Sequence, residues 1–398
     1  MKLIIVSEFF YPYKTSTQKI LTELAEDFVE YGLEVDVLTT KNAYREEKQK
    51  LSKFESYRGI NIKRIFSTNG NRDNKVFRII NYATFLSSLF INLLLKNDYN
   101  KILFVSNPPL APYIGYLIKK LKGKEYVYLV HDVYPDVAEK IGVIKKTGFI
   151  YKLMDKINNK IYLNASKVIV LGRDMKQIII NKGIKEEKIK IITNWADKNS
   201  NFETNVSEEF YEIYNMKNKF NILYTGNISK VHAVDTIIDV ARLLKDETDI
   251  KFTFVGDGNR KAYIEELKNK EGLDNIDLNN YVFGEEYNNL LNCADLFIST
   301  LQKGIEGLGV PSKTYTYMSV AKPIIAIMSK ESEIGNLVNE NNLGKQFEGT
   351  EAIEIARYIK QLKNNENEYK KISDNVRKYF NDNYERKIVT DKFYNEIN

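Results

Sequence analysis

The feature that most constrains the fold is a regular alternation of short apolar runs with longer amphipathic segments. The short runs are predicted to be buried strands, because they are rich in branched apolar residues and too short for helices. The longer segments carry apolar residues at three- and four-residue steps and are predicted to be helices. In the first half the expected strands are 3–6, 35–39, 102–105, 127–130 and 168–171, and the expected helices are 18–31, 150–164 and 175–182. This alternation is typical of an α/β protein with parallel sheets.

Near residue 200 the pattern is interrupted by a polar, charged stretch over 198–218. Strands and helices then resume, so we expect two α/β halves with a cleft between them. Their expected strands are 220–225, 252–255, 296–299 and 323–327, with helices over 236–245 and 368–398. Such halves bind ligands outside the carboxyl ends of their strands.

Charge and composition exclude several classes of protein. Lys plus Arg is 59 and Asp plus Glu is 53, a mild net charge of +6 that suits an anionic small ligand or a membrane surface and does not indicate nucleic acid. Cys293 is the one cysteine, which excludes a disulfide framework and a cysteine-based zinc site. His131 and His232 are the two histidines, too few for a histidine-rich metal centre. We therefore expect no metal and a reducing, cytoplasmic compartment.

Two segments bear on membrane contact. The apolar run 3–6 is too short for the core of a signal peptide. The longest apolar stretch, 79–95, contains two Asn and two Ser and falls short of the ~20 apolar residues of a spanning helix. It is either a helix buried against a sheet or one that touches a bilayer through its apolar side. In the second case the flanking basic residues would suit anionic lipid, and these are Lys75, Arg78, Lys96 and Lys101.

Several catalytic motifs are missing. Residues 7–14 follow the first strand and contain no glycine, so the dinucleotide fingerprint G-x-G-x-x-G is not there. The sequence also has no phosphate loop, no G-x-S-x-G elbow and no H-E-x-x-H zinc motif. An NAD enzyme, a P-loop NTPase, a serine hydrolase and a zinc peptidase therefore lose their best evidence.

Glycines instead follow strands of the second half. Gly226 ends the strand 220–225, with Lys230 close behind it, and Gly256 ends the next strand. Glycine permits close backbone approach, although each such position by itself is commonly only a turn. A third segment, 305–315, combines two glycines, a proline and a predicted helix start whose free N–H groups would face an anion. There Lys313 adds a positive charge, and the carboxylate of Glu306 can accept hydrogen bonds from sugar hydroxyls.

Residues 226–233 and 306–314 resemble the donor domain of family 4 retaining glycosyltransferases, which have the GT-B fold. The family pattern E-G-x-G-x-P-x-x-E is matched at Glu306, whereas Thr314 replaces the second Glu. In the element G-R-L-x-x-x-K-G, Asn227 replaces Arg and His232 replaces Lys. These departures resemble a subgroup of bacterial O-antigen and capsule enzymes similar to N-acetyl-fucosamine transferases. Its pattern is matched at 132–136 (DVYPD), 194–195 (NW), 226–227 (GN) and 311–313 (PSK), and the resemblance runs from about residue 2 to about 395.

The resemblance implies a donor site in a C-terminal domain over 201–377. Glu306 would hold donor-sugar hydroxyls, and Lys313 and Lys230 would neutralise the departing diphosphate. The backbone of Leu308 and Gly309, at a helix N-terminus, would meet that diphosphate, and Thr314 would bond the ribose. The full implied donor set is Gly226, Asn227, Lys230, Gly256, Val282, Phe283, Leu308, Gly309, Ser312 and Thr314, with Gly256, Val282 and Phe283 bordering the base.

The acceptor site would lie in an N-terminal domain over 1–200, on which a C-terminal helix over 378–398 packs back. Tyr11, Ser16 and Thr17 belong to a loop that is glycine-rich in the family and lies between acceptor and donor phosphate. His131 and Asp132 end a strand that faces the cleft. His131 would contact the sugar or polarise the acceptor hydroxyl, and its alternative is a purely structural histidine.

The activity implied is transfer of a sugar, an N-acetylated hexose or deoxyhexose, from a UDP-sugar with retention at the anomeric carbon. The acceptor implied is a polyprenyl-diphosphate-linked saccharide at the inner face of the plasma membrane, with lysines and helix ends in place of a metal. Two alternatives stay open: a UDP-sugar 2-epimerase, and a non-catalytic partner in a polysaccharide assembly complex. A Glu306→Ala variant separates an enzyme from such a partner, because only the enzyme loses an activity.

Overall fold

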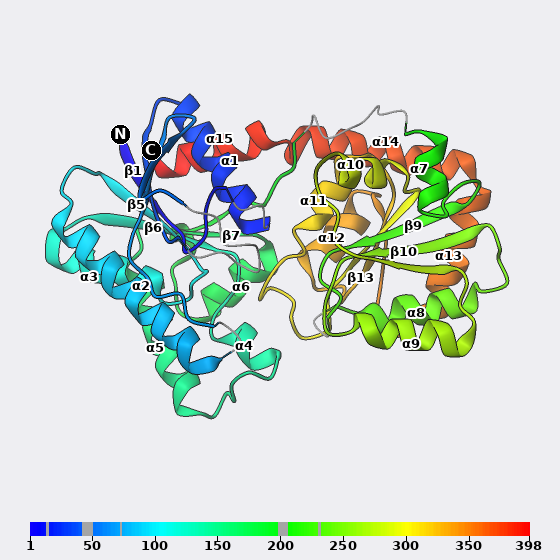
Figure 1. Cartoon of the computed structure of the whole chain (residues 1–398), viewed down its shortest axis with the longest axis horizontal. Helices are drawn as coiled ribbons and strands as arrows, with labels where there is room; N and C mark the ends of the chain where they lie inside the picture. Colours follow the sequence, from blue (N-terminus) through cyan, green and yellow to red (C-terminus); the bar gives the residue numbers. More distant parts are fainter. Residues whose placement is uncertain (13–15, 42–50, 72–73, 198–205, 230–231) are drawn as a thin grey trace. The chain divides into compact units, whose positions relative to one another are not determined.

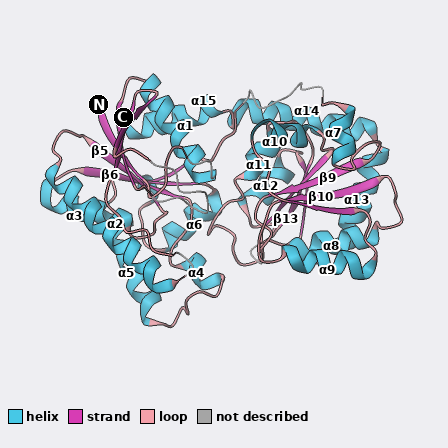
Figure 2. Ribbon diagram, in the orientation of Figure 1, coloured by secondary structure: helices cyan, strands magenta, loops and turns pink. Residues whose placement is uncertain are grey.

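The computed structural model describes residues 1–12, 16–41, 51–71, 74–197, 206–229 and 232–398. The chain divides into two compact units, unit 1 with Met1–Thr193 and Val389–Asn398, and unit 2 with Asn194–Ile388. Each unit is a mainly parallel sheet covered by helices (Figure 1, Figure 2). The predicted α/β class with two Rossmann-like domains is therefore confirmed.

The sheet of unit 1 has the strand order β3-β4-β2-β1-β5-β6-β7-β8. All neighbouring strands pair in parallel except β3 and β4, which form an antiparallel hairpin at one edge. The strands are β1 Lys2–Val6, β2 Glu34–Thr39, β3 Phe54–Tyr57, β4 Ile60–Arg64, β5 Lys101–Val105, β6 Glu125–Val130, β7 Lys167–Val170 and β8 Ile189–Ile191. The central strands are buried on both faces, which explains their nearly continuous apolar sequences.

Helices cover both faces of this sheet. From β1 the chain crosses to β2 on one side of the sheet order, whereas from β5 it crosses to β6 on the other side. Because both crossovers are right-handed, α1 covers one face of the sheet, and α2, α3 and α5 cover the other (Figure 1). The helices are α1 Ser16–Glu30, α2 Lys75–Leu95, α3 Ala111–Lys122, α4 Asp136–Lys140, α5 Phe149–Asn164, α6 Arg173–Asn181, the 3₁₀ turn η1 Glu186–Lys188, and α15 Arg386–Ile397. The end of α15 joins unit 1 through an ion pair of Glu396 with Lys167 at 2.6 Å.

Unit 2 has an all-parallel sheet with the order β11-β10-β9-β12-β13-β14. Its strands are β9 Phe220–Thr225, β10 Ile250–Val255, β11 Ile276–Asn279, β12 Leu296–Thr300, β13 Ile324–Ile327 and β14 Gly344–Phe347. Its helices are α7 Glu208–Ile213, α8 Val234–Leu243, α9 Lys261–Glu271, α10 Gly284–Asn292, α11 Lys313–Met318, α12 Glu333–Glu340, α13 Ala352–Asn364 and α14 Glu366–Asn383. Each predicted strand of this half matches one of these to within two residues.

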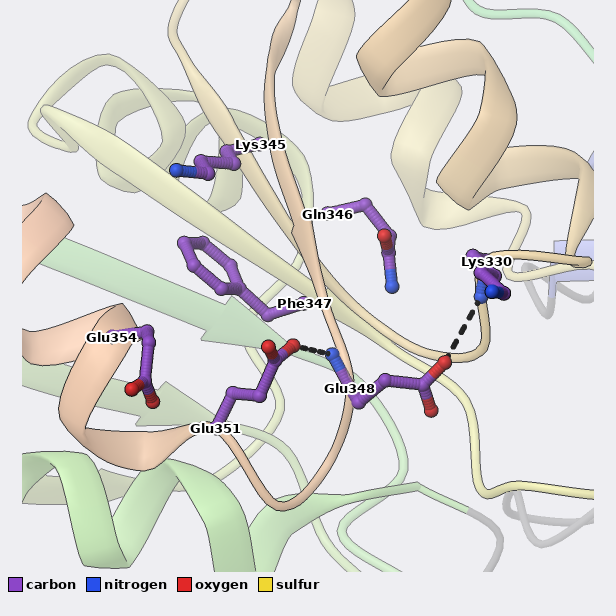
Figure 3. A pocket seen from close by; sticks show the side chains of 7 residues that line it. All are labelled: Lys330, Lys345, Gln346, Phe347, Glu348, Glu351 and Glu354. Atoms are coloured by element: carbon purple, nitrogen blue, oxygen red, sulfur yellow. Dashed lines mark hydrogen bonds between the residues drawn. The ribbon is translucent and has the colours of Figure 1, made fainter.

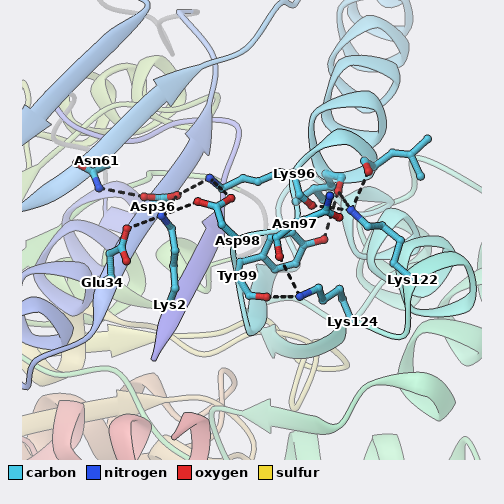
Figure 4. Close-up of polar contacts among 12 residues, drawn as sticks. Lys2, Glu34, Asp36, Asn61, Lys96, Asn97, Asp98, Tyr99, Lys122 and Lys124 are labelled. Carbon is cyan, nitrogen blue, oxygen red and sulfur yellow. Dashed lines mark hydrogen bonds and ion pairs between the residues drawn. The ribbon is translucent and has the colours of Figure 1, made fainter.

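A polar cluster joins the start of β1 to the end of α2 in unit 1 (Figure 4). The amines of Lys2 and Lys96 both contact Asp98, at 3.0 and 2.8 Å, and hold the pKa of that carboxyl below its ordinary value. Nearby, Lys122 of α3 donates to the carbonyl oxygens of Leu94 and Lys96, at 2.8 and 2.6 Å. The C-terminal carbonyls of α2 are thus capped by a cation, which ties α2 to α3.

The apolar helix α2 begins at Lys75 and is buried along one narrow stripe. Asn81, Phe85, Leu89 and Leu93, four residues apart, are at most 3% exposed. Other large apolar side chains of the helix are exposed, including Leu95 at 76%. The interpretation as a helix buried against a sheet therefore holds for one face only.

Candidate functional site

Each sheet has one point at which the strand order reverses. In unit 1 it lies between β1 and β5, and in unit 2 between β9 and β12. Loops that leave neighbouring strands in opposite directions open a crevice at such a point, where α/β proteins bind ligands. The predicted site residues of each unit follow these strands or their immediate neighbours, except Val282 and Phe283, which follow β11.

The two predicted glycine turns of unit 2 touch each other. Gly226 donates its N–H to Val255, at 2.7 Å, and a Cβ on Gly256 would lie 1.8 Å from the carbonyl oxygen of Gly226. Gly258 approaches the carbonyl of Ile228 in the same way, at 2.2 Å for an added Cβ. The loops after β9 and β10 therefore form one closely packed backbone surface that requires glycine.

Lys313, the first residue of α11, reaches into this surface. Its amine donates to the carbonyl oxygen of Thr225 and lies 4.5 Å from the centre of the Tyr224 ring. A Cβ on Gly226 would clash with that amine, at 2.2 Å. Burial lowers the pKa of Lys313 to about 7. The amine is thus held at the end of β9, where an arriving anion would stabilise its charged form.

Aromatic and hydroxyl side chains hold the end of β9 in place. The hydroxyl of Tyr317, in α11, accepts the N–H of Thr225 at 3.0 Å. His232 contacts the carbonyl oxygen of Thr300, at the end of β12, through Nδ1 at 3.1 Å. Burial and, second, the charge of Lys313 lower the pKa of His232 to about 4, so that its ring is neutral at pH 7.

Glu306 lies in the loop between β12 and α11. One carboxylate oxygen, Oε2, accepts the backbone N–H of Gly304 at 2.6 Å, which fixes the side chain. The other, Oε1, is buried and has no hydrogen-bond partner among the described residues. A buried carboxylate oxygen without a donor is costly, and a bound hydroxyl group would satisfy it.

The expected helix N-terminus at Leu308 and Gly309 is wrong, because α11 begins at Lys313. The N–H of Leu308 donates to the carbonyl of Ile305 at 3.0 Å and closes a turn. The N–H groups of Thr314 and Tyr315, the second and third residues of α11, donate to the carbonyl oxygens of Pro311 and Ser312. These three N–H groups bond to the protein, so the positive charge of Lys313 is the clearer anion-attracting feature here.

Thr314 is also placed differently from the expectation. Its side chain is completely buried, and its hydroxyl pairs with Ser299 of β12 at 2.8 Å. A side chain in this position stabilises the base of the loop and does not offer its hydroxyl to a ribose. Ser312, the N-cap of α11, is partly exposed and makes no capping bond with its side chain.

The remaining donor residues lie in the loops that follow β9 and β11. Asn227 is exposed directly after Gly226. Val282 and Phe283 follow β11, whose last residue, Asn279, accepts the N–H of Gly256 at 3.0 Å. The Phe283 ring is 64% exposed, as an aromatic ring that borders a base would be. Lys230 lies outside the described residues.

In unit 1, His131 and Asp132 follow β6 as predicted. Their backbone N–H groups both donate to the hydroxyl of Ser106, at 3.0 Å each. Burial lowers the pKa of His131 to about 4 and raises the pKa of Asp132 to about 6. Nε2 of His131 is buried and lacks a partner among the described residues, so a neutral ring is available for one further hydrogen bond.

The acceptor loop is described only in part. The Tyr11 ring stacks on Tyr57 with centroids 3.7 Å apart, and its carbonyl accepts from Arg64 at 2.9 Å. The edge hairpin β3–β4 therefore positions Tyr11. Ser16 and Thr17 begin α1, where Thr17 is partly exposed and the Ser16 side chain lies outside the described residues.

A pocket of about 300 Å³ lies elsewhere in unit 2, at the end of β14 (Figure 3). Glu348, Glu351 and Glu354 line it, together with Lys330 and Lys345. Glu351 accepts the backbone N–H of Glu348 at 2.6 Å. The three glutamates make this side of the pocket rich in carboxylates. Such a wall repels a diphosphate, so we place the anion site at Lys313 and the glycine turns.

We expect Gly256→Ala to lower the free energy of unfolding by at least about 2 kcal/mol, because the new Cβ would overlap the carbonyl oxygen of Gly226. Thermal and urea denaturation measure this loss. Gly349→Ala is the control, since its Cβ would meet its nearest neighbour at an ordinary 3.5 Å. Equal stability of the two variants would contradict the close packing of the two loops.

Sequence reasoning missed the residues that hold the site from behind. Thr225, Tyr317 and Ser106 make the hydrogen bonds described above, yet none stands out in a motif. The one available signal was their position, because Thr225 and Ser106 end or follow strands at the two points of order reversal. The partner of each is distant in sequence and could not be found from spacing.

Family models of known proteins match both halves of the chain. A family model described as Glycosyltransferase Family 4 matches residues 17–200, and one described as Glycosyl transferases group 1 matches residues 206–379.

Among the described residues, no group of three or more His, Cys, Asp or Glu side chains is arranged to hold a metal ion.

Individual relatives extend over much of the chain. The "Probable glycosyltransferase WbjE" of Pseudomonas aeruginosa is 31% identical over 266 residues, which are 66% of this chain and 65% of that protein. The "Putative colanic acid biosynthesis glycosyl transferase WcaI" of Escherichia coli is 23% identical over 85% of this chain and 86% of its own length. The solved structure of HepE from Anabaena in complex with UDP-glucose has a TM-score of 0.73 at 15% identity, and the match covers 100% of this chain and 99% of HepE. The match to HepE shows that this chain and HepE share a fold.

Proposed function

The chain belongs to the glycosyltransferases of the GT-B fold, and from this premise we propose that it transfers a sugar from a UDP-sugar to a lipid-linked saccharide. The observation that carries the proposal is the amine of Lys313, held against the glycine turns at the end of β9. A nucleoside diphosphate brings negative charge to this position. HepE, with the same fold, is solved with UDP-glucose, which supports UDP as the nucleotide.

The proposed reaction retains the configuration of the anomeric carbon. The bond between this carbon and the diphosphate oxygen breaks, and the acceptor hydroxyl forms the new bond on the same face and gives its proton to the departing diphosphate. The transition state, with an oxocarbenium-like sugar and a departing diphosphate, needs positive charge and dipoles more than it needs a strong base. Lys313 supplies that charge, Glu306 holds sugar hydroxyls through Oε1, and neutral His131 bonds the sugar or the acceptor.

The proposed setting is bacterial cell-surface polysaccharide synthesis. WcaI is named for colanic acid biosynthesis, which supports this setting. We propose that the donor sugar is an N-acetylated hexose or deoxyhexose and that the acceptor is a polyprenyl-diphosphate-linked saccharide of the O-antigen or capsule type. Transfer would take place without a metal at the cytoplasmic face of the plasma membrane.

A thermal-shift panel of UDP, GDP, dTDP, CMP and UDP-sugars, with and without Mg²⁺, tests the donor assignment. A nucleotide at 100 times its dissociation constant adds about 2.7 kcal/mol of apparent stability, which raises the melting temperature by several degrees. We expect this shift with UDP and with one UDP-sugar, and equally without Mg²⁺. A protein that no nucleotide stabilises would contradict the donor site, and a shift that requires Mg²⁺ would contradict metal-independent binding.

A further inference from the structure

Three helices form one layer on unit 1, and their C-terminal ends are level. The helices α2, α3 and α5 each connect parallel strands, so all three run antiparallel to the sheet and parallel to one another. At one end of the layer, Lys122 of α3 donates to Leu94 of α2 at 2.8 Å, and Lys119 of α3 donates to Asn164 of α5 at 2.9 Å. The three helices are thereby aligned at these ends.

The N-terminal ends are not level, because the middle helix is the shortest. α3 has 12 residues, whereas α2 has 21 and α5 has 16. The N–H of Leu110, before α3, donates to the hydroxyl of Tyr82 in α2 at 2.7 Å. The turns of α2 before Tyr82 and the first turns of α5 therefore extend beyond α3 at the same end of the layer (Figure 1).

Large apolar side chains are exposed on these protruding ends and on the loop that leads into α5. Their exposed fractions lie between 42% and 78%, and Phe149 is the most exposed. We call this set the apolar tip: Val76, Phe77, Ile79, Ile80, Ile141, Val143, Phe149, Ile150 and Leu153. Exposed apolar side chains in this number at one end of a helical layer are typical of an interaction surface.

The apolar tip is surrounded by positive charge. Residues 138–160 contain six lysines and two acidic residues, and the lysines Lys140, Lys145, Lys146, Lys152 and Lys156 are exposed among the apolar side chains. Of the two acids, Asp155 pairs with Lys182 at 2.8 Å, an amine that also pairs with Asp136 at 2.8 Å. The exposed Arg78 adds a charge on α2, which contains no acidic residue.

We propose that the apolar tip inserts into the surface of an anionic phospholipid bilayer, with the surrounding lysines on the headgroups. Apolar side chains ringed by Lys and Arg are the pattern that binds anionic membranes at the interface. A second copy of the chain fits less well, because a symmetric contact would bring the two lysine clusters together. Counted from Val76 to Leu95, the helix is long and apolar enough to span a bilayer, which corrects the expectation drawn from 79–95. Phe85, Leu89 and Leu93 nevertheless pack inside unit 1 and hold the helix in the domain.

The position of the apolar tip suits a membrane-borne acceptor. Tyr151, in the first turn of α5, donates to Asp136 at 2.8 Å, just beyond the end of β6 that carries His131 and Asp132. The apolar tip therefore lies at the carboxyl edge of the sheet, on the side of the proposed acceptor residues. This role rests on the proposed function, whereas binding to a bilayer can be measured without it.

The test is flotation of the full-length protein with phosphatidylcholine vesicles, with or without phosphatidylglycerol, in the absence of donor and acceptor. We expect strong binding only to the anionic vesicles. The double variants Phe77→Ser/Ile79→Ser and Phe149→Ser/Ile150→Ser, and the charge reversal Lys145→Glu/Lys146→Glu, should each weaken that binding about tenfold or more. UDP binding should be unchanged in all three variants.

The matched control is Leu95→Ser/Leu163→Ser, which removes two exposed apolar side chains from the opposite ends of α2 and α5. It should bind vesicles as the unaltered protein does. The proposal is overturned if the unaltered protein does not float with anionic vesicles, or if the control loses as much binding as the tip variants. It is also overturned if the unaltered protein and the control are dimers and only the tip variants are monomers. If the unaltered protein does not bind UDP but does float with anionic vesicles, the proposed function is contradicted while the membrane-binding proposal stands.

Discussion

Replacement of Lys313 by methionine is expected to lower the rate of sugar transfer by about 10²–10³-fold, the effect of removing one preorganised group that stabilises developing negative charge. Methionine retains the apolar stem that packs beside Tyr224 but carries no charge to the Thr225 carbonyl. The readout is release of UDP from the UDP-sugar selected by thermal shift, with water in place of the acceptor. Lys345→Met, in the pocket at β14, is the control and should be fully active.

The same variant should change how stability depends on pH. The pKa of Lys313 is about 7 in the folded protein and 10.5 in its ordinary state. Between pH 7 and pH 10.5 the amine of Lys313 is protonated in the unfolded chain and largely neutral in the folded protein. The contribution of Lys313 to the free energy of unfolding therefore rises as the pH rises from 7 to 10.5, and it is lowest below pH 7. Lys313→Met removes this dependence and should melt higher than the unaltered protein at pH 7.

Nucleotide binding should be linked to the same proton. A diphosphate beside the amine favours its charged form, so UDP binding above pH 7 should take up a proton and weaken by up to about tenfold per pH unit. Calorimetry of UDP binding in two buffers of different ionisation enthalpy measures that uptake. Binding without proton uptake at pH 8 in the unaltered protein would contradict the position assigned to the diphosphate.

The central strands were predictable because of where they lie. Strands such as β1 and β12 are buried on both faces of a parallel sheet, so their sequences are nearly continuously apolar and unlike any helix. The edge hairpin β3–β4 was missed because its strands are short and partly exposed, with the polar sequence FESY in β3. The long C-terminal helix predicted over 368–398 is divided at Tyr384 and Glu385, between α14 and α15.

The site was predictable where chemistry depends on residue type and not where it depends on packing. Gly226, Gly256 and Lys313 were identified from sequence and meet in the structure. The sequence pattern places the start of α11 several residues too early, because the glycines and proline of 305–311 indicate turns but do not indicate which turn begins the helix. The buried pairing of Thr314 with Ser299 depends on how β12 and α11 pack, which spacing along the chain does not contain.

Glu306→Gln should separate sugar recognition from nucleotide binding. The amide oxygen can still accept the N–H of Gly304, so the loop keeps its geometry, while the amide NH₂ replaces the unpartnered acceptor Oε1 with a donor. A sugar hydroxyl that donates to the carboxylate loses its acceptor, which costs about 1.5–3 kcal/mol and so lowers the turnover of the UDP-sugar by about 10–100-fold. Glu306→Ala should abolish turnover, because it also releases the loop.

UDP itself lacks the sugar, so its affinity should stay the same in Glu306→Gln, and calorimetry provides that comparison. Glu354→Gln, an exposed carboxylate of the pocket at β14, is the matched control and should change neither quantity. Weaker UDP binding in Glu306→Gln would move Glu306 from the sugar to the nucleotide. If neither the unaltered protein nor any variant releases UDP while all bind it, the non-catalytic partner becomes the better account, because Glu306 would then hold a sugar that is not transferred.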